Sequence, residues 1–479
     1  DVVSHYLADT NATRISYQVE NVGFTFKTGG IGLRDITFSE GHGKLIGIMG
    51  ASGAGKTTLL NVLAGIESPT SGKVLINGID LHSEKDQLEG VTGVIPQDDL
   101  LIEELTVFEN LYYNAKLCFK DKSDEELTQL VHKTLSNLGL FERKDLKVGS
   151  PLNKMISGGQ RKRLNIALEL IREPSILFVD EPTSGLSSRD SENVMDLLRE
   201  LTQKGKLIFV VIHQPSSDIY KMFDNMMILD TGGYMIYYGN PVEAVMYFKR
   251  LDMQINSDVG ECPTCGNVNP ELIFNIIEAK VVDEFGQYTP TRKVSPPKWG
   301  EYFNENIKIK KVATEDVKPP KSLDIPSRFK QFLIYTTRDF LSKISNSQYI
   351  ALNLLETPIL AFILAYVIRY IADPNSSVYI FRENENIPIY IFMSLIVALF
   401  IGLTVSAEEI FRDRKILKRE SFLNLSRTSY LFSKISILLT ISAIQTISFV
   451  LIANSILAIK GMYFEYWLVL FSTAIFANM

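Results

Sequence analysis

The chain has 479 residues, of which 22% are charged, and its formal net charge is −6. This length suits two or three domains, and the negative charge gives no support to nucleic-acid binding. Its three cysteines, Cys118, Cys262 and Cys265, are too few for a disulfide framework and are typical of a cytosolic main body. The mean hydropathy of +0.08 is high for so charged a chain and predicts a soluble part joined to an apolar part.

The two ends of the sequence favour a fragment of a longer protein. The sequence begins at Asp1 rather than at a methionine, without a recognisable signal peptide, and it stops at Met479 inside an apolar run. We therefore expect further residues on both sides.

Residues 14–280 predict an α/β domain. Residues 14–48 alternate apolar and polar positions, as half-buried strands do. The runs 175–180 and 207–213 are continuously apolar, as in parallel strands that are buried on both faces. Because residues 100–170 show helical spacing, the whole pattern predicts an α/β core with an inserted helical region.

Residues 281–326 predict a linker, because charged residues fill them and six prolines interrupt them. These prolines are Pro290, Pro296, Pro297, Pro319, Pro320 and Pro326. Residues 327–343 then predict an amphipathic helix on a membrane surface, with an ordinary surface helix as the alternative. Its apolar face carries Phe329, Phe332, Leu333 and Phe340, and its basic residues are Arg328, Lys330, Arg338 and Lys343.

Residues 344–479 predict an all-α transmembrane domain. The apolar segments 350–371, 388–407 and 435–459 each reach the roughly 20 residues that a bilayer requires. A fourth segment begins near Met462. Long apolar helices in the core of a soluble protein are the alternative, and the occurrence of several in series argues against it.

The charges of the connecting loops predict the orientation of this domain. The loop 372–386 contains one basic residue, Arg382, whereas the loop 408–429 contains six. These six are Arg412, Arg414, Lys415, Lys418, Arg419 and Arg427. By the positive-inside rule, we expect loop 408–429 and the N-terminal domain in the cytoplasm.

A phosphate-binding turn is predicted between the apolar segment 44–49 and a helix that begins near Lys56. Its sequence fits the G-x-x-x-x-G-K-[ST] motif in the strand–turn–helix context that the motif requires. Glycines let backbone N–H groups surround phosphate oxygens, Lys56 supplies a positive charge, and Thr57 offers a hydroxyl to Mg²⁺. The expected nucleotide-binding residues here are Gly50, Ser52, Gly53, Gly55, Lys56, Thr57 and Thr58. A chance glycine-rich turn is the alternative.

Two adjacent carboxylates end the apolar run 176–179. Because successive strand residues point to opposite faces, Asp180 and Glu181 can serve different tasks. We expect Asp180 to hold Mg²⁺ and Glu181 to act as the general base that polarises the attacking water. A solvated strand end is the alternative, and the phosphate-binding turn upstream makes it less favoured.

The run Ser157-Gly158-Gly159-Gln160 opens a helix about twenty residues before these carboxylates. In this order of motifs, the sequence resembles the ATP-binding cassette family, whose signature motif is Ser-Gly-Gly-Gln. The resemblance implies that these four residues contact the γ-phosphate bound to a second cassette, so that two cassettes enclose two ATP molecules. The helix N-terminus adds a second anion-binding site.

Other landmarks follow the order of that family. The resemblance implies that Gln97 ligates Mg²⁺ and senses the membrane domain, and that His213 contacts the γ-phosphate and assists catalysis. It also implies that Phe26 stacks on adenine, although Phe24 competes for this role. Residues 184–187 match the loop that links the two cassettes, where Ser187 replaces the usual aspartate.

The order of cassette first and membrane domain second resembles the G subfamily of these transporters. Five segments are similar to that subfamily: 105–111, 158–163, 212–229, 269–277 and 408–434. The resemblance implies a six-helix membrane domain and a half-transporter that acts as a dimer, by expectation a homodimer. It implies ATP-driven export of a lipid-like or hydrophobic substrate by a multi-pass membrane protein among membrane lipids. We expect a bacterial cell membrane, with ATP and Mg²⁺ as cofactors and no nucleic-acid partner.

Two other classes of function stay open at this stage. One is an ATP-switched membrane regulator or pore without active transport, and the other is a soluble cassette ATPase that acts on ribosomes or DNA. Intact Glu181 and His213 argue against the first, and the apolar segments argue against the second. Outside the ATP site, Glu356 is either a substrate or proton site or a polar helix contact. The pair Cys262 and Cys265 is either two free thiols, a disulfide, or part of a zinc site completed by a second chain.

Overall fold

The computed structural model describes residues 14–150, 155–320, 322–369, 379–407, 409–420, 423 and 425–478. The chain divides into two compact units. The first unit comprises residues 1–100, 123–146 and 154–324, and the second comprises residues 101–122, 147–153 and 325–479. The last two residues of the expected apolar segment 350–371, residues 372–378 of the expected loop, and the side chains of Lys415, Lys418 and Arg419 lie outside the described residues.

A six-stranded sheet forms the centre of the first unit, in the order β10-β9-β3-β8-β7-β6. Its strands are β3 (Leu45–Gly50), β6 (Thr92–Ile95), β7 (Ile176–Asp180), β8 (Leu207–Val211), β9 (Asn225–Asp230) and β10 (Tyr234–Gly239). All neighbours are parallel except β10, which pairs antiparallel with β9. Every residue of β8 and every residue of β7 except Asp180 is buried, which confirms the prediction that the apolar runs 175–180 and 207–213 form strands covered on both faces.

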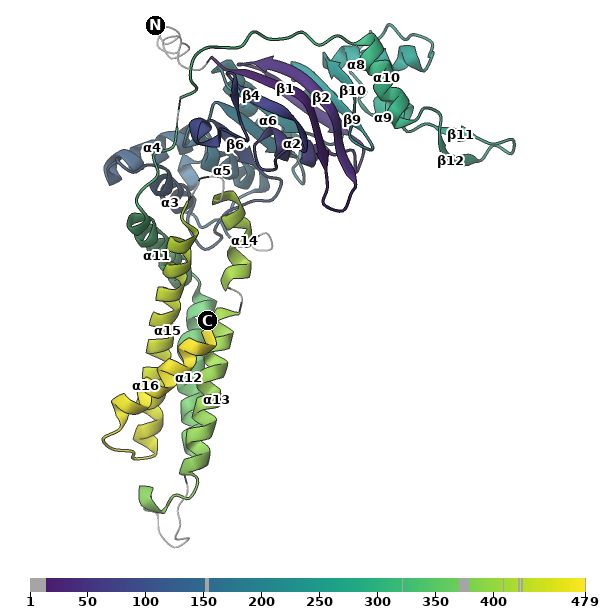
Figure 1. Cartoon of the computed structure of the whole chain (residues 1–479). Helices are drawn as coiled ribbons and strands as arrows, with labels where there is room; N and C mark the ends of the chain where they lie inside the picture. The colour runs from purple at the N-terminus through teal and green to yellow at the C-terminus, as the bar shows by residue number, and fades with distance from the viewer. Residues whose placement is uncertain are drawn as a thin grey trace. The chain divides into compact units, whose positions relative to one another are not determined.

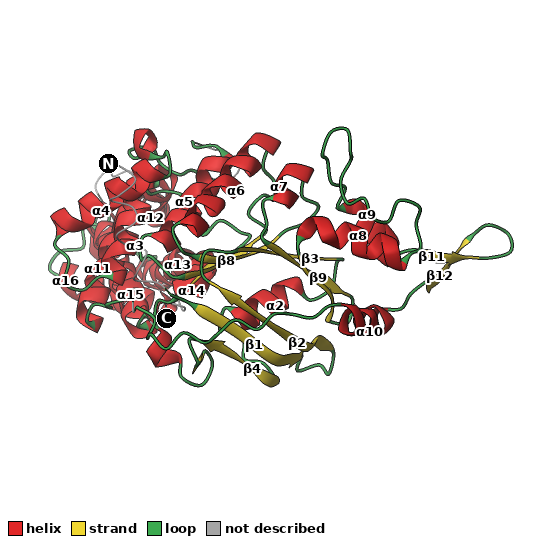
Figure 2. Cartoon of the chain, turned by 90° about the horizontal axis from the view of Figure 1, so that it is seen from above, coloured by secondary structure: helices red, strands yellow, loops and turns green. Residues whose placement is uncertain are grey.

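A four-stranded antiparallel sheet and several helices cover this central sheet. The antiparallel sheet has the order β2-β1-β4-β5 and consists of β1 (Ser16–Thr25), β2 (Ile31–Gly41), β4 (Ser71–Ile76) and β5 (Ile79–Asp80). The helices are α2 (Lys56–Leu63), α4 (Asp124–Asn137), α5 (Gly158–Leu170), α6 (Ser188–Gln203), α7 (Ser217–Lys221), α8 (Pro241–Leu251) and α9 (Glu271–Ile277). Figure 2 shows α5, α6 and α7 on one face of the central sheet, and α2 with the antiparallel sheet on the other.

The segment expected to be a linker contains secondary structure. Its elements are β11 (Lys280–Val282), β12 (Tyr288–Arg292) and α10 (Pro296–Asn306). Pro296 begins α10, a position where the missing N–H has no helical partner to lose. Beyond α10 the chain returns along the antiparallel sheet, where Gln18 donates to the carbonyl of Val312 (3.1 Å) and Ser39 to that of Lys310 (3.1 Å). Residues 296–312 are therefore part of the first unit.

The second unit is helical. Its helices are α3 (Val107–Cys118), α11 (Arg328–Ser345), α12 (Ser347–Ile368), α13 (Ile387–Ser406), α14 (Glu409–Glu420), α15 (Arg427–Ile456) and α16 (Tyr463–Asn478). Among the described residues, α12, α13 and α15 are long and apolar enough to cross a membrane. Figure 1 shows these three helices side by side, with α16 against them. The carboxylate of Glu356 lies half-buried on α12.

The two faces of α11 have opposite environments. Its aromatic face is exposed, with Phe329 71% and Phe340 52% accessible. Its polar face is buried and includes Gln331, Arg338 and Asp339. The helix therefore presents apolar side chains outward, in keeping with the expectation of a helix that lies on a membrane surface.

Candidate functional site

The turn between β3 and α2 forms an anion-binding cradle. Lys56 folds back over the turn, and its Nζ donates to the carbonyls of Gly50 (2.8 Å) and Ala51 (3.0 Å). Gly55 precedes the helix with φ at 92°, and a Cβ there would lie 2.6 Å from the carbonyl oxygen of Gly32. Because α2 has no side-chain cap, the N–H groups of its first turn are left for a ligand such as phosphate. The side chains of Ser52 and Thr57 are exposed here.

Asp180, at the end of β7, provides an oxygen ligand beside this cradle. Its side chain is hydrogen-bonded to Thr57, the last residue of the motif. Its Oδ1 is buried and lacks a hydrogen-bond partner within the described part of the chain. Burial, followed by the charge of Glu181, raises the pKa of Asp180. A buried, unpartnered carboxylate oxygen next to a hydroxyl matches the hard oxygen ligands that Mg²⁺ prefers, so these residues fit the ion.

Glu181 and Gln97 meet next to Asp180. The Nε2 of Gln97 donates a hydrogen bond of 2.8 Å to Oε2 of Glu181. Glu181 occupies the left-handed region with φ at 44°, which turns its side chain out of the alternation of β7. Burial lowers the pKa of Lys56, and the charges of Glu181 and Asp180 act in the opposite direction. The lysine, the two carboxylates and the glutamine thus form one electrostatic site.

His213 and Phe26 lie at the ends of other strands of this unit. His213 is exposed just beyond β8, and Gln214 after it has φ at 44°. Phe26 follows β1, is 44% exposed, and meets Phe24 edge-to-face with ring centroids 5.2 Å apart. Since Phe24 packs against the core, Phe26 is the ring whose face is more available to a base.

The Ser157 turn begins α5 with a reciprocal pair of hydrogen bonds. Ser157 Oγ accepts from the backbone N–H of Gln160 (3.2 Å), and Gln160 Oε1 accepts from the N–H of Ser157 (2.9 Å). A Cβ on Gly159 would lie 2.5 Å from Oδ1 of Asp190, so any larger residue here would displace that side chain. Gly158 lies near Leu186, which places the turn beside residues 184–187.

Ser187 caps α6 at a position where the family usually has aspartate. Its Oγ accepts from the backbone N–H of Asp190 (3.2 Å) and donates to Oδ2 of the same residue (2.9 Å). Serine and aspartate are both favoured at this helix position. The substitution therefore keeps the local structure of the loop while removing one negative charge.

Buried polar residues on α5 hold residues 96–99, the Gln97 segment, and the sequence did not predict this role for them. Lys162 Nζ donates to the carbonyls of Gln97 (2.8 Å) and Pro96 (3.3 Å), and Arg161 pairs with Asp99 at 3.2 Å. Burial lowers the pKa of Lys162, and the Asp99 carboxylate opposes this shift. A signal was present in the sequence, because the basic run after the Ser157 motif and the acidic pair after Gln97 have opposite charges.

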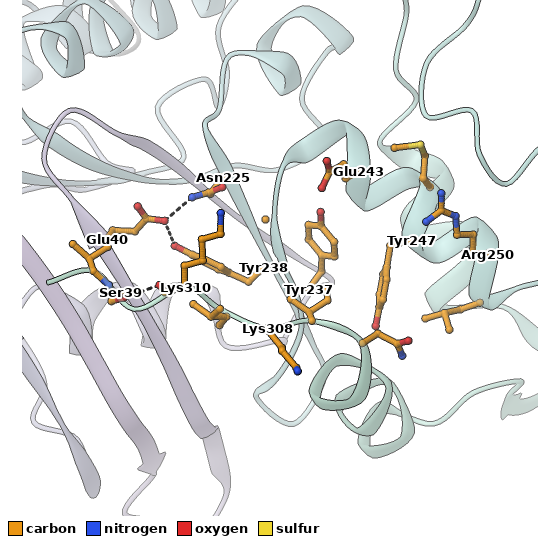
Figure 3. Close-up of a pocket in the computed structure, with 17 residues that line it drawn as sticks. Ser39, Glu40, Asn225, Tyr237, Tyr238, Glu243, Tyr247, Arg250, Lys308 and Lys310 are labelled. Carbon is orange, nitrogen blue, oxygen red and sulfur yellow. Dashed lines mark hydrogen bonds between the residues drawn. The ribbon is translucent and has the colours of Figure 1, made fainter.

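A second cavity of about 890 Å³ lies in the first unit and shares no lining residue with the ATP site. Figure 3 shows Glu40 pointing toward Asn225 and Tyr238, both of which donate hydrogen bonds to its Oε1. Burial, opposed first by the Tyr238 hydrogen bond, raises the pKa of Glu40. Lys308 and Lys310 line the same cavity.

Family comparisons match both units. A family model described as "ABC transporter" matches residues 33–184. Two models described as "ABC-2 type transporter" match residues 330–479 and 213–284. The matches together cover the ATP-site motifs and the helices that are long enough to cross a membrane.

Individual relatives are of the same kind. The chain is 40% identical over 210 residues to ABC transporter G family member 13 of Arabidopsis thaliana, covering 43% of this chain and 30% of that protein. It is 30% identical over 370 residues to protein white of Drosophila melanogaster, covering 71% of this chain and 51% of that protein. The chain thus spans about half or less of the length of these relatives. The solved structure of cbiO1 from Clostridium perfringens is similar with a TM-score of 0.44 and 26% identity, over 50% of this chain and 95% of cbiO1.

Proposed function

Because this chain belongs to the ATP-binding cassette transporter family, with its ATP-binding domain ahead of an ABC-2 type membrane domain, we propose that it hydrolyses ATP to export a hydrophobic or lipid-like substrate. The observation that carries the proposal is the meeting of Lys56, Asp180, Glu181 and Gln97 at one edge of the central sheet. These residues supply a cation for phosphate, an unpartnered oxygen for a metal ion, and a base.

The chemistry follows from these positions. Lys56 and the N-terminus of α2 hold the phosphates, while Thr57, Asp180 and Gln97 would hold Mg²⁺, which supplies charge stabilisation to the leaving phosphate. Glu181 polarises the attacking water. In this structure Oε2 of Glu181 accepts from the amide of Gln97, and the second oxygen of the carboxylate can accept from the attacking water. His213, exposed beyond β8, is placed to contact the γ-phosphate.

Two copies of the chain are required by this mechanism. Ser157 is exposed at the start of α5, and the turn is already stabilised by its own capping bonds. The capping bonds use the N–H groups of Ser157 and Gln160, and the positive end of the helix dipole can still attract an anion from another molecule. A homodimer in which each Ser157 turn covers the ATP bound to the other copy accounts for this feature.

Coupling between hydrolysis and transport is proposed to pass through the second unit. This unit joins residues 101–122, which fall inside the ATP-binding family match, to helices of the membrane-domain match. Glu104 accepts a hydrogen bond from Ser342 on α11 (3.1 Å) and pairs with Arg412 on α14 (3.5 Å). A displacement of residues 101–122 therefore acts directly on α11 and α14.

Buried ion pairs hold the same helices together. Lys434 on α15 pairs with Asp339 on α11 (2.6 Å) and with Asp413 on α14 (2.8 Å). Arg338 on α11 pairs with Glu420 on α14. Burial alone would raise the pKa of Asp413, but the neighbouring Lys434 ammonium holds it below its usual range, so the network is charged at neutral pH.

Reconstitution of the protein in liposomes tests the proposal. We expect Mg²⁺-dependent ATPase activity that rises with one class of lipid or hydrophobic compound, and ATP-dependent movement of that compound across the bilayer. Lys56→Ala should abolish both activities and ATP binding, because it removes the cation of the cradle. ATP binding with no hydrolysis and no movement under any condition would instead favour an ATP-switched regulator and refute the proposal.

A further inference from the structure

Residues 262–266 form a tight Cys-Pro-Thr-Cys-Gly turn in the loop that joins α8 to α9, both labelled in Figure 2. Two backbone hydrogen bonds close the turn, from Gly266 N to Cys262 O (2.8 Å) and from Cys262 N to Asn267 O (2.8 Å). Gly266 has φ at 69°, and a Cβ there would meet nothing within 4 Å. Glycine is thus required by the backbone conformation rather than by space.

The thiols of Cys262 and Cys265 lie next to each other in the turn. The backbone N–H groups of Cys265 and Thr264 donate to the sulfur of Cys262, and the Cys265 side chain also bonds to it. Cys262 is half-buried and Cys265 is exposed, so both sulfurs are accessible. Amide N–H donors directed at a cysteine sulfur stabilise the thiolate, which is the form that binds soft and borderline metal ions.

Two hydrogen bonds to α7 fix the C-terminal end of the turn to the rest of the first unit. Lys221 Nζ, from α7, donates to the carbonyl of Gly266 (3.0 Å). The backbone N–H of Val268 donates to Oγ of Ser217, also on α7 (2.9 Å). The pair of sulfurs therefore has a fixed position and does not depend on a flexible loop for its geometry.

The turn supplies only half of a metal site. A closed structural zinc site has four ligands, and the part of the chain that the structure describes contains no cluster of three or more His, Cys, Asp or Glu residues around a metal position. The same loop carries Met253 and Ile255, which are 92% and 91% exposed. A second chain that packed against this loop would remove these two apolar side chains from water.

We infer that Cys262 and Cys265 of two copies of this chain together bind one zinc ion in a tetrahedral site with four cysteine ligands. The inference rests on the proposed dimer and adds a link between its two ATP-binding domains that nucleotide does not control. Binding is a ligand exchange without redox chemistry: Zn²⁺ replaces the four thiol protons, which are released to solvent. Two identical turns related by a twofold axis supply the four ligands of such a site.

Zinc stoichiometry tests this inference. The detergent-solubilised protein is reduced, loaded with Zn²⁺, freed of excess metal by gel filtration and measured by elemental analysis. We expect about 0.5 zinc per chain, since two copies share one ion. The variants Cys262→Ser and Cys265→Ser should each bind no zinc. The matched control Cys118→Ser, at a buried position of α3, should still bind it. Co²⁺ in place of Zn²⁺ should show the charge-transfer absorption of a tetrahedral thiolate site.

Thiol protection provides a measurement on the unsubstituted protein. Bound zinc should block alkylation of Cys262 and Cys265 by iodoacetamide, and a chelator should restore it. One zinc per chain, unchanged zinc in both serine variants, or a Cys262–Cys265 disulfide that persists in reductant and excludes zinc would each overturn the inference. None of these readouts is ATP hydrolysis, so a failure to bind zinc leaves the proposed transport function standing. Zinc binding by a protein without ATPase activity would support the zinc site and contradict the proposed transport function.

Discussion

The side-chain amide of Gln97 donates to the carboxylate of Glu181 across 2.8 Å, so the residue expected at the metal ion and the expected base are in direct contact. They come together because β6 and β7 are adjacent parallel strands, whose carboxyl ends lie at the same edge of the sheet. In the proposed mechanism, movement of Gln97 toward a bound metal ion would leave both carboxylate oxygens of Glu181 available to water.

Glu181→Gln should retain ATP binding and lose turnover. The amide cannot accept a proton from water, and general-base catalysis contributes about 10²- to 10⁴-fold, so we expect ATPase activity to fall by at least about 100-fold. Steady-state ATPase assays in liposomes and nucleotide-binding titrations measure the two properties separately. Glu192→Gln on α6 is the matched control and should retain full activity. Turnover close to wild type would remove Glu181 as the base.

Lys162→Met should slow hydrolysis although Lys162 is not a ligand in the proposed ATP site. The substitution keeps the buried volume but removes the charged hydrogen bonds to the carbonyls of Gln97 and Pro96. One charge-assisted bond contributes about 1.5 kcal/mol, so we expect roughly tenfold lower turnover. Arg163→Met is the control, because its 2.9 Å bond goes to Leu138 rather than to the Gln97 segment. Equal losses in the two variants would contradict a specific role for Lys162.

Ser187→Asp should destabilise the ATP-binding domain although it restores the residue usual in the family. The new carboxylate would stand where Ser187 Oγ now donates to Asp190 at 2.9 Å, so two like charges would face each other. Ser187→Asn keeps a capping oxygen without charge and should be close to wild type. Thermal unfolding of the three proteins gives the comparison, and the aspartate variant should recover at low pH. A more stable aspartate variant would disprove the account.

Glu40→Gln should raise stability at alkaline pH. The folded-state pKa of Glu40 is raised, so its contribution is fully present below the unfolded-state pKa and is lost as pH rises through the folded-state pKa. Glutamine does not titrate and still accepts from Tyr238 and Asn225. The difference in melting temperature between variant and wild type should therefore grow as the pH rises above the ordinary glutamate pKa of about 4.3, and it should level off above the folded-state pKa of Glu40. Glu243→Gln, at an exposed residue of the same cavity, is the matched substitution for comparison.

The sequence predicted the elements that local patterns determine. Buried strands, the cradle around Lys56 and the cap at Ser157 follow from short-range periodicity and glycine positions, and parallel neighbours then bring Gln97 to Glu181. It did not predict that Lys162 supports the Gln97 segment, because that contact joins residues 65 positions apart. Nor did it predict that residues 101–122 share a unit with α11, because this grouping depends on tertiary packing alone.

Helix α11 illustrates a further limit of sequence patterns. Periodicity separates an aromatic face from a polar face, but it does not say which of them another helix covers. In the structure, Arg338 and Asp339 are buried while Phe329 is exposed. The polar face is covered because Glu420 and Lys434 complement its charges, and such complementarity lies outside the periodic pattern.

These ion pairs determine how α11 can move. A slide of one helical turn, about 5.4 Å, would part Arg338 from Glu420 and Asp339 from Lys434. Each buried charge that loses its partner destabilises the structure by several kcal/mol. An apolar interface would tolerate the same displacement with a small loss of stability. The three helices therefore act as a stiff block with a single allowed alignment, and force applied at one end reaches the other without being absorbed.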